Sequence, residues 1–335
     1  MAGPEPSLLL RIRWLAKIYA IKLAVKLQVF ILTNFKPHRP TYKKVYPALP
    51  SIENNIFLPQ NWKRGDPPLP LLIDIHGGGF TIGAPAIDNM DNFILASYGI
   101  CVVSIGYRLA PANKFPGPVY DIAALITAVL DDPDLPIDRN KVAIAGYSAG
   151  GNLALTAPQL NDLHTRIKGV VAYYPVTDTG RKMEVRMRTA VSPPGRKDIL
   201  LNMSPMFHWA YFPKNVDVTD PLLAPLRAAR DKICEKVYVI GVEYDLLCGE
   251  AEETAEAYAL ADRDAGAVTG HRVELGEGRV GWREGNITWE KLLGLEHAFN
   301  QRMDLVRGAR KKMWMAKTIE MHKNVAEWLF REVFD

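Results

Sequence analysis

Five short apolar runs rich in β-branched residues recur along the chain and alternate with segments of helical periodicity. The runs cover residues 71–75, 100–105, 141–145, 169–174 and 236–240. Runs of this kind are typical of strands buried on both faces of a parallel sheet. The helical segments cover residues 118–130, 149–160, 249–262 and about 311–330. The alternation predicts one α/β fold with a mostly parallel central sheet and helices on both of its faces.

Two segments interrupt this alternation. Residues 180–215 are rich in Met and aromatic side chains and contain a Pro-Pro break, which predicts a helical excursion between strands. Residues 264–286 are polar and rich in Gly, which is typical of a loop or hairpin. We therefore expect N-terminal amphipathic helices over residues 1–45, and one α/β domain over residues 46–335 that carries the insertion at 180–215.

The stretch from residue 8 to residue 32 is strongly apolar but contains five basic residues. Its longest charge-free run, residues 27–35, is nine residues long, whereas a membrane-spanning helix needs about 20. A secretory signal peptide does not fit either, because the charges continue too far. One apolar stripe recurs at helical spacing and consists of Leu9, Ile12, Ala16, Tyr19, Leu23, Leu27 and Phe30. We expect this stripe to pack on the body of the protein. A helix lying on a membrane surface is the alternative, because all five charges are positive.

The charge and cysteine content narrow the class of protein. The 41 basic and 37 acidic residues give a net charge of +4, which is less than the concentrated positive charge of a nucleic-acid-binding protein. Cys101, Cys234 and Cys248 have no spacing typical of a metal site. We therefore expect no nucleic-acid partner and no metal, and we expect reduced structural thiols in a cytoplasmic protein.

The sequence GYSAGG at residues 146–151 lies between a predicted strand and a predicted helix. In a Gly-x-Ser-x-Gly turn of this kind, the serine hydroxyl projects above the edge of the sheet. Small residues at Gly146 and Gly150 let the strand and the helix approach each other closely there. A plain βα turn has similar residues, but the setting favours Ser148 as a nucleophile.

The sequence HGGGF at residues 76–80 directly follows the predicted strand 71–75. Three consecutive glycines destabilise regular structure, so they are favoured where backbone N–H groups must turn toward a ligand. Together with the N–H group of Ala149, which follows the serine, these N–H groups form the pattern of an oxyanion hole. A flexible turn is the simpler interpretation, but the second motif 72 residues later makes coincidence unconvincing.

A serine nucleophile needs a base, and the order Ser, acid, His places that base after Ser148. The chain has five histidines in this part: His164, His208, His271, His297 and His322. His297 follows an apolar strand-like run and lies beside small and aromatic residues. The others lie at a polar helix end, in the two insertions or in the last helix. Position therefore favours His297 as the base.

The acid is expected between the serine and the histidine. Asp245 follows the predicted strand 236–240 by a short loop, which places it at the carboxyl end of a strand, where catalytic loops gather. Glu243 and Glu250 are the alternatives. A single Asp in a loop is more often a turn residue, so this assignment depends on the order of the whole set.

These motifs, together with YRLAP at 107–111, FP at 115–116, DPL at 220–222 and HAF at 297–299, resemble the hormone-sensitive-lipase-like family of α/β-hydrolases. Its members include bacterial and fungal carboxylesterases and arylacetamide deacetylases. The similarity covers about residues 65–335. It implies an α/β-hydrolase fold, a triad of Ser148, Asp245 and His297, and no cofactor. It also implies oxyanion donors at Gly78, Gly79 and Ala149, and a cap built from the N-terminal helix and residues 180–215.

The sequence departs from the family pattern at three places. Tyr147 stands where Asp or Thr usually precedes the serine, and Ala112 stands where Glu usually follows YRLAP. The insertion at 264–286 separates Asp245 from His297 by 52 residues. The first two differences concern substrate preference more than chemistry, and the third suggests an extra hairpin near the rim of the site.

The sequence therefore predicts a serine carboxylesterase for small-to-medium apolar or aromatic esters. The apolar preference is suggested by the side chains of the insertion: Met183, Met187, Met203, Met206, Phe207, Trp209, Tyr211 and Phe212. An aryl-amide hydrolase, a lipid-ester hydrolase at a membrane surface, and a non-catalytic receptor on the same fold are the alternatives. The expected partner is a small-molecule ester, and a homodimer is also possible from the sequence. His297 argues against the receptor, because receptors of this fold have lost that histidine.

Overall fold

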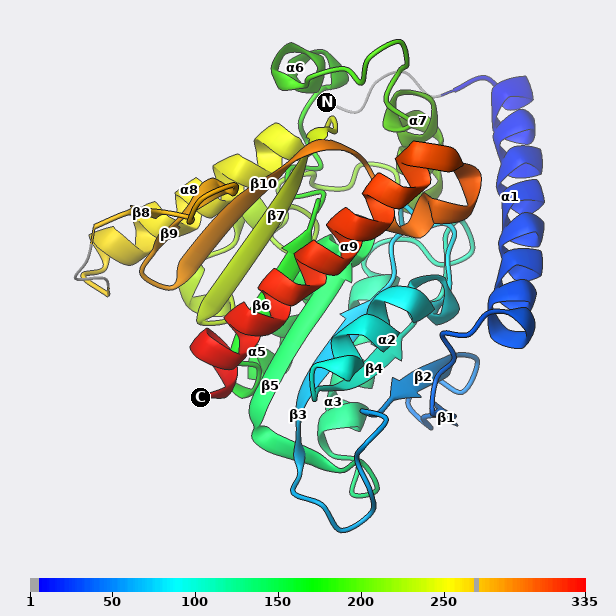
Figure 1. The fold of residues 1–335 in the computed structure, drawn as a ribbon. Helices are drawn as coiled ribbons and strands as arrows, with labels where there is room; N and C mark the ends of the chain where they lie inside the picture. Colours follow the sequence, from blue (N-terminus) through cyan, green and yellow to red (C-terminus); the bar gives the residue numbers. More distant parts are fainter. Residues whose placement is uncertain (1–5, 268–270) are drawn as a thin grey trace.

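The computed structural model describes residues 6–267 and 271–335 and arranges them around one central sheet (Figure 1). The strands are β1 (Tyr42–Val45), β2 (Glu53–Phe57), β3 (Leu69–Ile75), β4 (Cys101–Ile105), β5 (Ile137–Tyr147), β6 (Gly169–Tyr173), β7 (Lys236–Tyr244), β8 (Val273–Glu274), β9 (Val280–Glu284) and β10 (Ile287–Glu296). Within the described residues their order is β1-β2-β4-β3-β5-β6-β7-β10-β9-β8. Pairing is parallel from β4 to β10 and antiparallel at both edges.

Helices cover both faces of this sheet. They are α1 (Leu8–Phe35), α2 (Asn89–Ser97), α3 (Gly117–Leu130), α4 (Ala149–Thr156), α5 (Leu163–Arg166), α6 (Met183–Thr189), α7 (Leu200–Tyr211), α8 (Cys248–Asp264) and α9 (Gly308–Leu329). Side chains of α2 and α9 form the apolar core on one face, and side chains of α3, α4 and α8 form the core on the other. Figure 1 shows α9 crossing the front of the sheet beside α2. The predicted α/β-hydrolase architecture is therefore confirmed.

All five predicted strands are present, as β3, β4, β5, β6 and β7. Their central positions are buried, as the β-branched runs predicted. The insertion at 264–286 contains the antiparallel strands β8 and β9, which extend the sheet beyond β10; its residues 268–270 lie outside the described residues. The antiparallel strands β1 and β2 and the helix α2 were not predicted, because their sequences are too polar to show a buried pattern. Since β1 belongs to the sheet, residues 42–45 are part of the α/β layer rather than of an N-terminal helical segment.

The prediction for the face that α1 buries is wrong. Leu9, Leu23 and Leu27 of the predicted stripe are 59%, 70% and 61% exposed, and the remaining members of the stripe are also exposed. The opposite side of the helix packs on the body instead, through the buried Ile18 and the partly buried Trp14 and Ile21. Both sides of this helix are apolar, so periodicity alone could not distinguish the buried side from the exposed one. Among the residues that the structure describes, no helix is both long enough and apolar enough to cross a membrane.

The predicted excursion at 180–215 forms the two helices α6 and α7 above the carboxyl ends of the strands (Figure 1). The helix α7 is anchored by the buried Met206 and Tyr211. The ring of Tyr211 stacks on Phe80 of the HGGGF motif, with 3.9 Å between the ring centroids. The helix α1 contacts the same element, because Trp14 lies against Trp209 with 5.7 Å between centroids. The helix α7 therefore lies between α1 and the glycine-rich loop.

Candidate active site

Ser148 lies on a sharp turn between β5 and α4. Its φ of 55° and ψ of −114° belong to a region that residues other than Gly rarely occupy. A Cβ on Gly146 would overlap the carbonyl oxygen of Gly150, and a Cβ on Gly150 would overlap the carbonyl oxygen of Ile75. The predicted close approach of strand and helix is therefore confirmed. The strained backbone of the serine is held by packing that has no room for side chains on either side of it.

The glycine-rich loop after β3 turns tightly against the serine. The carbonyl oxygen of Gly78 accepts hydrogen bonds from the N–H groups of Thr81 and Ile82, both at 3.0 Å. Gly78 and Gly79 have φ values of 117° and 57°, which a residue with a Cβ adopts only with strain. The preceding His76 is fully buried, and burial lowers its pKa to about 4. The loop therefore rests on an uncharged imidazole.

The three backbone groups predicted as oxyanion donors come from two segments that meet at Ser148. Gly79, Ser148 and Ala149 line one cavity. The N–H group of Ala149 belongs to the first turn of α4, where the helix offers it no acceptor. A Cβ on Gly77 would lie 2.9 Å from the carbonyl oxygen of Tyr147, so the backbone of the loop directly adjoins the serine turn. Gly79 and Ala149 therefore line the cavity beside Ser148, whereas Gly78 lies outside its lining.

Ser148, His297 and Asp245 form a continuous chain of hydrogen bonds. Nδ1 of His297 lies 2.7 Å from Oδ2 of Asp245, and Nε2 lies 3.0 Å from the Ser148 hydroxyl oxygen. Since the carboxylate can only accept, Nδ1 donates to Asp245, and the serine hydroxyl donates to Nε2. The other oxygen of Asp245 accepts from the N–H group of Leu247 at 2.9 Å. All three side chains are buried, and they extend from the carboxyl ends of β5, β7 and β10.

The other acids and histidines considered from the sequence lie elsewhere. Glu243 accepts a hydrogen bond from the N–H group of Gly294 at 2.7 Å. His322 bonds to Asp91 at 2.7 Å, under the opposite face of the sheet. His208 lines the cavity beside Ser148 but is bonded to neither Ser148 nor Asp245 in the described structure. Asp245 is therefore the carboxylate that contacts His297.

The environment of His297 favours its protonated form. Burial lowers its pKa, but the adjacent Asp245 carboxylate and the charge of Asp198 outweigh burial, so the pKa of His297 lies above its usual value of 6.5. A base of this kind is uncharged only above its raised pKa. Any reaction that uses Nε2 to accept the serine proton should therefore lose rate as the pH falls through that pKa.

Asp198 is a neighbour of the triad that the sequence did not reveal. Its carboxylate accepts hydrogen bonds from the N–H groups of Leu200 and Leu246, both at 2.7 Å. Burial and the nearby Asp245 raise the pKa of Asp198. This residue joins the start of α7 to the loop that carries Asp245. Because its partners are backbone groups 2 and 48 residues away, nothing in the local sequence connects it to the triad.

The cavity beside Ser148 has a volume of about 90 Å³. Its walls are the glycine-rich loop on one side and α7 on the other, with Phe207, Tyr211 and Leu200 facing the serine. A second cavity of about 490 Å³ lies under α1 and contains none of the three triad residues. The smaller cavity is therefore the one that a reacting group would enter. Of the eight side chains that suggested an apolar substrate, three line this cavity: Phe207, Tyr211 and Phe212. The other five lie outside its lining: Met183, Met187, Met203, Met206 and Trp209.

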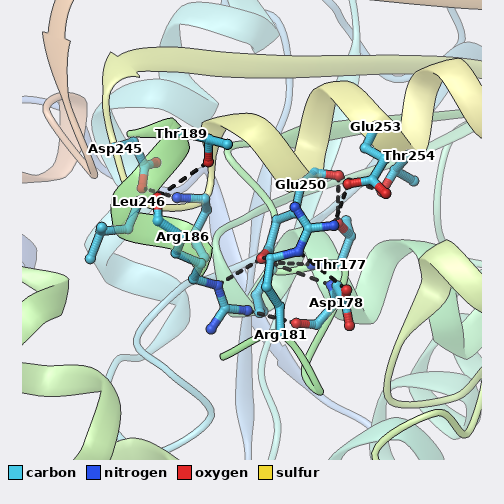
Figure 2. Close-up of polar contacts among 12 residues, drawn as sticks. Thr177, Asp178, Arg181, Arg186, Thr189, Asp245, Leu246, Glu250, Glu253 and Thr254 are labelled. Carbon is cyan, nitrogen blue, oxygen red and sulfur yellow. Dashed lines mark hydrogen bonds and ion pairs between the residues drawn. The ribbon is translucent and has the colours of Figure 1, made fainter. Parts of the chain in front are cut away.

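One charged side chain also lines this small cavity. Figure 2 shows Arg186 of α6 extending toward the fully buried Glu250 of α8. Its Nε donates to Glu250 Oε2 at 2.7 Å, and its Nη2 donates to the carbonyl oxygen of Asp178 at 2.7 Å. Glu250 also accepts from the N–H groups of Thr177 and Asp178 at 3.0 and 3.4 Å. The carboxylate thus fixes the guanidinium beside the cavity, and within the described residues no hydrogen bond occupies Nη1.

Three buried carboxylates, Asp74, Asp88 and Asp91, lie close enough to one another to interact electrostatically. Burial raises the pKa of Asp74 to about 7 and raises the pKa of Asp88 well above its usual range. The third carboxylate, Asp91, bonds to His322 at 2.7 Å and to Asn300 at 3.0 Å. Asn300 also accepts from the hydroxyl of Tyr174 at 2.5 Å, and the ring of Tyr174 contacts His297, with 5.0 Å between centroids. Through Tyr174, this hydrogen-bond network packs against the imidazole of His297.

The described residues contain no group of three or more His, Cys, Asp or Glu side chains placed to hold a metal ion. Cys101, Cys234 and Cys248 are buried and unpaired, and burial raises the pKa of each thiol to about 12. A thiol with such a pKa stays protonated at neutral pH and is a poor nucleophile or ligand. The Ser148 hydroxyl is therefore a better candidate nucleophile than any of these thiols.

Comparison with known proteins gives one family and several relatives. The model of the alpha/beta hydrolase fold family matches residues 72–274. An arylesterase of Saccharolobus solfataricus is 31% identical over 207 residues, which is 59% of this chain and 64% of that protein. A carboxylic ester hydrolase of Mycobacterium tuberculosis is 32% identical over 206 residues, which is 57% of this chain and 53% of that protein. The chain therefore matches less than two thirds of the length of these curated relatives.

Solved structures share the fold over most of the chain. An esterase of the archaeon Pyrobaculum calidifontis covers 99% of this chain and 100% of its own, with a TM-score of 0.73 and 24% identity. A fungal esterase of Rhizomucor miehei covers 92% of this chain and 90% of its own, with a TM-score of 0.71 and 20% identity. Together with the family match, these similarities confirm the resemblance to α/β-hydrolases that the HGGGF and GYSAGG motifs indicated.

Proposed function

We propose that this chain, which belongs to the alpha/beta hydrolase fold family, is a serine carboxylesterase that works through an acyl-enzyme. The observation that carries the proposal is the hydrogen-bond chain from Ser148 through His297 to Asp245, with distances of 3.0 and 2.7 Å. Relatives named as an arylesterase and a carboxylic ester hydrolase support it.

In this mechanism, Nε2 of His297 accepts the hydroxyl proton of Ser148 while the serine oxygen attacks the ester carbonyl. Asp245 holds the imidazole with Nδ1 protonated and stabilises the imidazolium that forms. The N–H groups of Gly78, Gly79 and Ala149 stabilise the negative charge on the carbonyl oxygen. His297 then protonates the leaving alcohol, and water, activated by the same imidazole, releases the acid.

The cavity suggests which esters fit. A volume of about 90 Å³ is well below the roughly 300–1,000 Å³ of sites that enclose whole drug-sized ligands. A short acyl chain fits such a space, and longer chains need displacement of Phe207. Arg186 also lines this cavity, and its Nη1 has no hydrogen-bond partner among the described residues. We therefore expect small-to-medium esters with apolar or aromatic groups, and we expect better turnover where the substrate offers Arg186 an acceptor.

A panel of p-nitrophenyl esters from acetate to laurate, assayed beside an aryl amide, tests this proposal. We expect kcat/KM to be highest for short acyl chains and the amide to be cleaved slowly. Ser148→Ala should lower kcat by about 10⁴–10⁶-fold without changing the circular-dichroism spectrum. Residual activity above about a tenth of that of the unmodified protein would exclude Ser148 as the nucleophile. Faster cleavage of the amide than of the esters would identify the protein as an amidase instead.

A further inference from the structure

We propose that the outward face of α1 is a docking surface for an anionic lipid membrane. The proposal concerns where the protein lies and does not depend on which ester it hydrolyses. It rests on the exposed side chains of the helix, on the charge of the N-terminal region, and on the contact of the inner side of α1 with α7.

The outward face is a continuous apolar surface, and the ring contacts of its members, Phe30 with Phe35 and Tyr19 with Lys22, are within the helix itself. We define it as Leu9, Ile12, Tyr19, Leu23, Leu27 and Phe30, whose exposed fractions range from 54% to 70%. Because each residue of a helix turns about 100° from the last, these six side chains lie within an arc of about 80°. Figure 1 shows α1 running along the edge of the molecule, on the far side of the sheet from α8 and β8. An apolar strip of this length is unfavourable in water and marks an interaction site.

The charge around this face is entirely positive. The helix itself, residues 8–35, contains five Lys and Arg residues and no Asp or Glu. Arg13 and Lys26 border the outward face, Lys17 lies farther round the helix, and all three are exposed. Basic side chains in this position can extend toward lipid head groups while the apolar face enters the acyl boundary. The combination of apolar stripe and basic borders is complementary to an anionic membrane surface.

The same charge argues against a second copy of this chain as the occupant. Two such helices packed face to face would bring two basic helices together, and the sequence of neither helix contains an acidic residue. Repulsion between those charges would oppose the apolar gain. An anionic lipid surface meets both requirements, because it accepts the apolar side chains and attracts the basic ones.

The inner side of α1 connects this surface to the active-site wall. Ile18 is fully buried and Trp14 contacts Trp209 of α7. Lys22 donates from Nζ to the carbonyl oxygen of Ala110 at 2.7 Å. Since Phe207 of α7 lines the cavity beside Ser148, only the helices α1 and α7 would separate a membrane on the outward face from the cavity. An ester dissolved in the lipid would then reach the site without crossing much water.

The test is co-sedimentation of the full chain with vesicles of phosphatidylcholine, alone or containing phosphatidylglycerol. We expect binding to the anionic vesicles at about 0.15 M salt, and weaker binding at about 1 M salt. Leu23→Gln combined with Leu27→Gln should weaken binding by at least about tenfold. Arg13→Gln, Lys17→Gln and Lys26→Gln together should weaken binding to anionic vesicles by about a hundredfold, at about fivefold per charge, and should affect neutral vesicles little.

The matched control is Leu260→Gln combined with Val273→Gln, because these side chains are 49% and 56% exposed and lie on α8 and β8, away from α1. It should bind vesicles as the unmodified chain does, and every variant should keep hydrolysis of a water-soluble ester. Failure of the full chain to bind anionic vesicles at about 0.15 M salt would overturn the proposal. So would a lipid-free dimer, measured by light scattering, that the Leu23→Gln and Leu27→Gln changes convert to monomers.

Discussion

The turn around Ser148 and the helix α1 are opposite in the way they use apolar and small residues. Around the serine, the backbone atoms of β3, β5 and α4 are so close that neither Gly146 nor Gly150 has room for a Cβ. Along α1, large side chains such as Leu23 and Leu27 are 70% and 61% exposed. The residues around the serine find all their packing partners within the chain. The exposed side chains of α1 would need a partner outside the chain to be buried.

This difference separates two tasks. A reaction needs the oxyanion donors, the nucleophile and the base within a few tenths of an ångström of their working positions, which close packing of backbone against backbone provides. Delivery of the substrate needs only a surface of the right polarity near the entrance. The helix α7 lies between the two regions, since Trp209 contacts Trp14 of α1 and Phe207 lines the cavity.

The largest expected effect comes from changing the carboxylate that contacts His297, compared with a nearby carboxylate that does not. Asp245→Asn should lower kcat/KM for a short ester by about 10⁴-fold, because the amide favours the wrong imidazole tautomer. Glu243→Gln should lower it by less than about tenfold, because Glu243 is bonded to the N–H group of Gly294 and not to His297. Steady-state kinetics on p-nitrophenyl acetate measure both effects. The reverse ranking would assign the acid to Glu243.

A second comparison tests whether the serine turn is as tightly packed as it looks. Gly146→Ala places a methyl group against the Gly150 carbonyl and should lower the free energy of unfolding by about 3 kcal/mol. Gly117→Ala is the matched control, because the nearest atom to its added Cβ, Cβ of Asn113, is 3.9 Å away. Chemical denaturation measures both variants. Equal stability of the two would mean that the strand and the helix can separate at little cost.

A change at Arg186 tests whether this residue of α6 binds the substrate or only supports the surrounding structure. Arg186→Met keeps much of the side-chain volume but removes every guanidinium donor, including Nη1, which has no hydrogen-bond partner among the described residues. We expect kcat/KM for a p-nitrophenyl hemiester of a short dicarboxylic acid to fall by about tenfold or more. The neutral ester of equal length should change by less than about threefold. Equal losses on both substrates would show that Arg186 only supports Glu250 and α6.

Much of the fold and of the candidate site could be predicted from local sequence. The buried strands show as β-branched runs, and the glycines at 77–79, 146 and 150 show where backbone segments must approach closely. The order Ser, acid, His left Glu243 and Glu250 open as the acid, and the family resemblance selected Asp245. The structure brings Ser148, Asp245 and His297 together. These features are local in sequence, or they follow a fixed order along a known topology.

The features that sequence could not predict depend on packing between distant segments. Asp198 acts through backbone groups, so its role leaves no motif. The helix α1 is apolar on both sides, so the choice of its buried side depends on Trp209 and the rest of the surface it meets. The carboxylates Asp74, Asp88 and Asp91 lie in different elements and give no sequence signal of a cluster. In each case the local sequence is compatible with more than one structural environment, and contacts with distant segments decide which environment forms.

The smallest expected effect tests the buried carboxylates that support the site from behind. Burial, together with the charges of Asp74 and Asp91, raises the pKa of Asp88 well above its unfolded value. Below the unfolded pKa of about 4 this group is neutral in both states, and as the pH rises the unfolded chain ionises first. Ionisation of the unfolded state lowers the stability of the folded protein between that pH and the raised pKa of Asp88.

Asp88→Asn removes this ionisation while it keeps an oxygen for Gln301, which donates to Asp88 Oδ1 at 2.5 Å. The Tm of this variant relative to the unmodified chain should therefore increase as the pH rises from about 4 to about 8, by about 2–4 °C for each kcal/mol of lost penalty. Asp264→Asn, at an exposed position on α8, is the control and should show no such trend. A Tm difference for Asp88→Asn that stays constant or shrinks with pH would mean that Asp88 is ionised in the folded protein. The cluster would then carry negative charge under the glycine-rich loop, and the site would be supported by charge rather than by neutral hydrogen bonds.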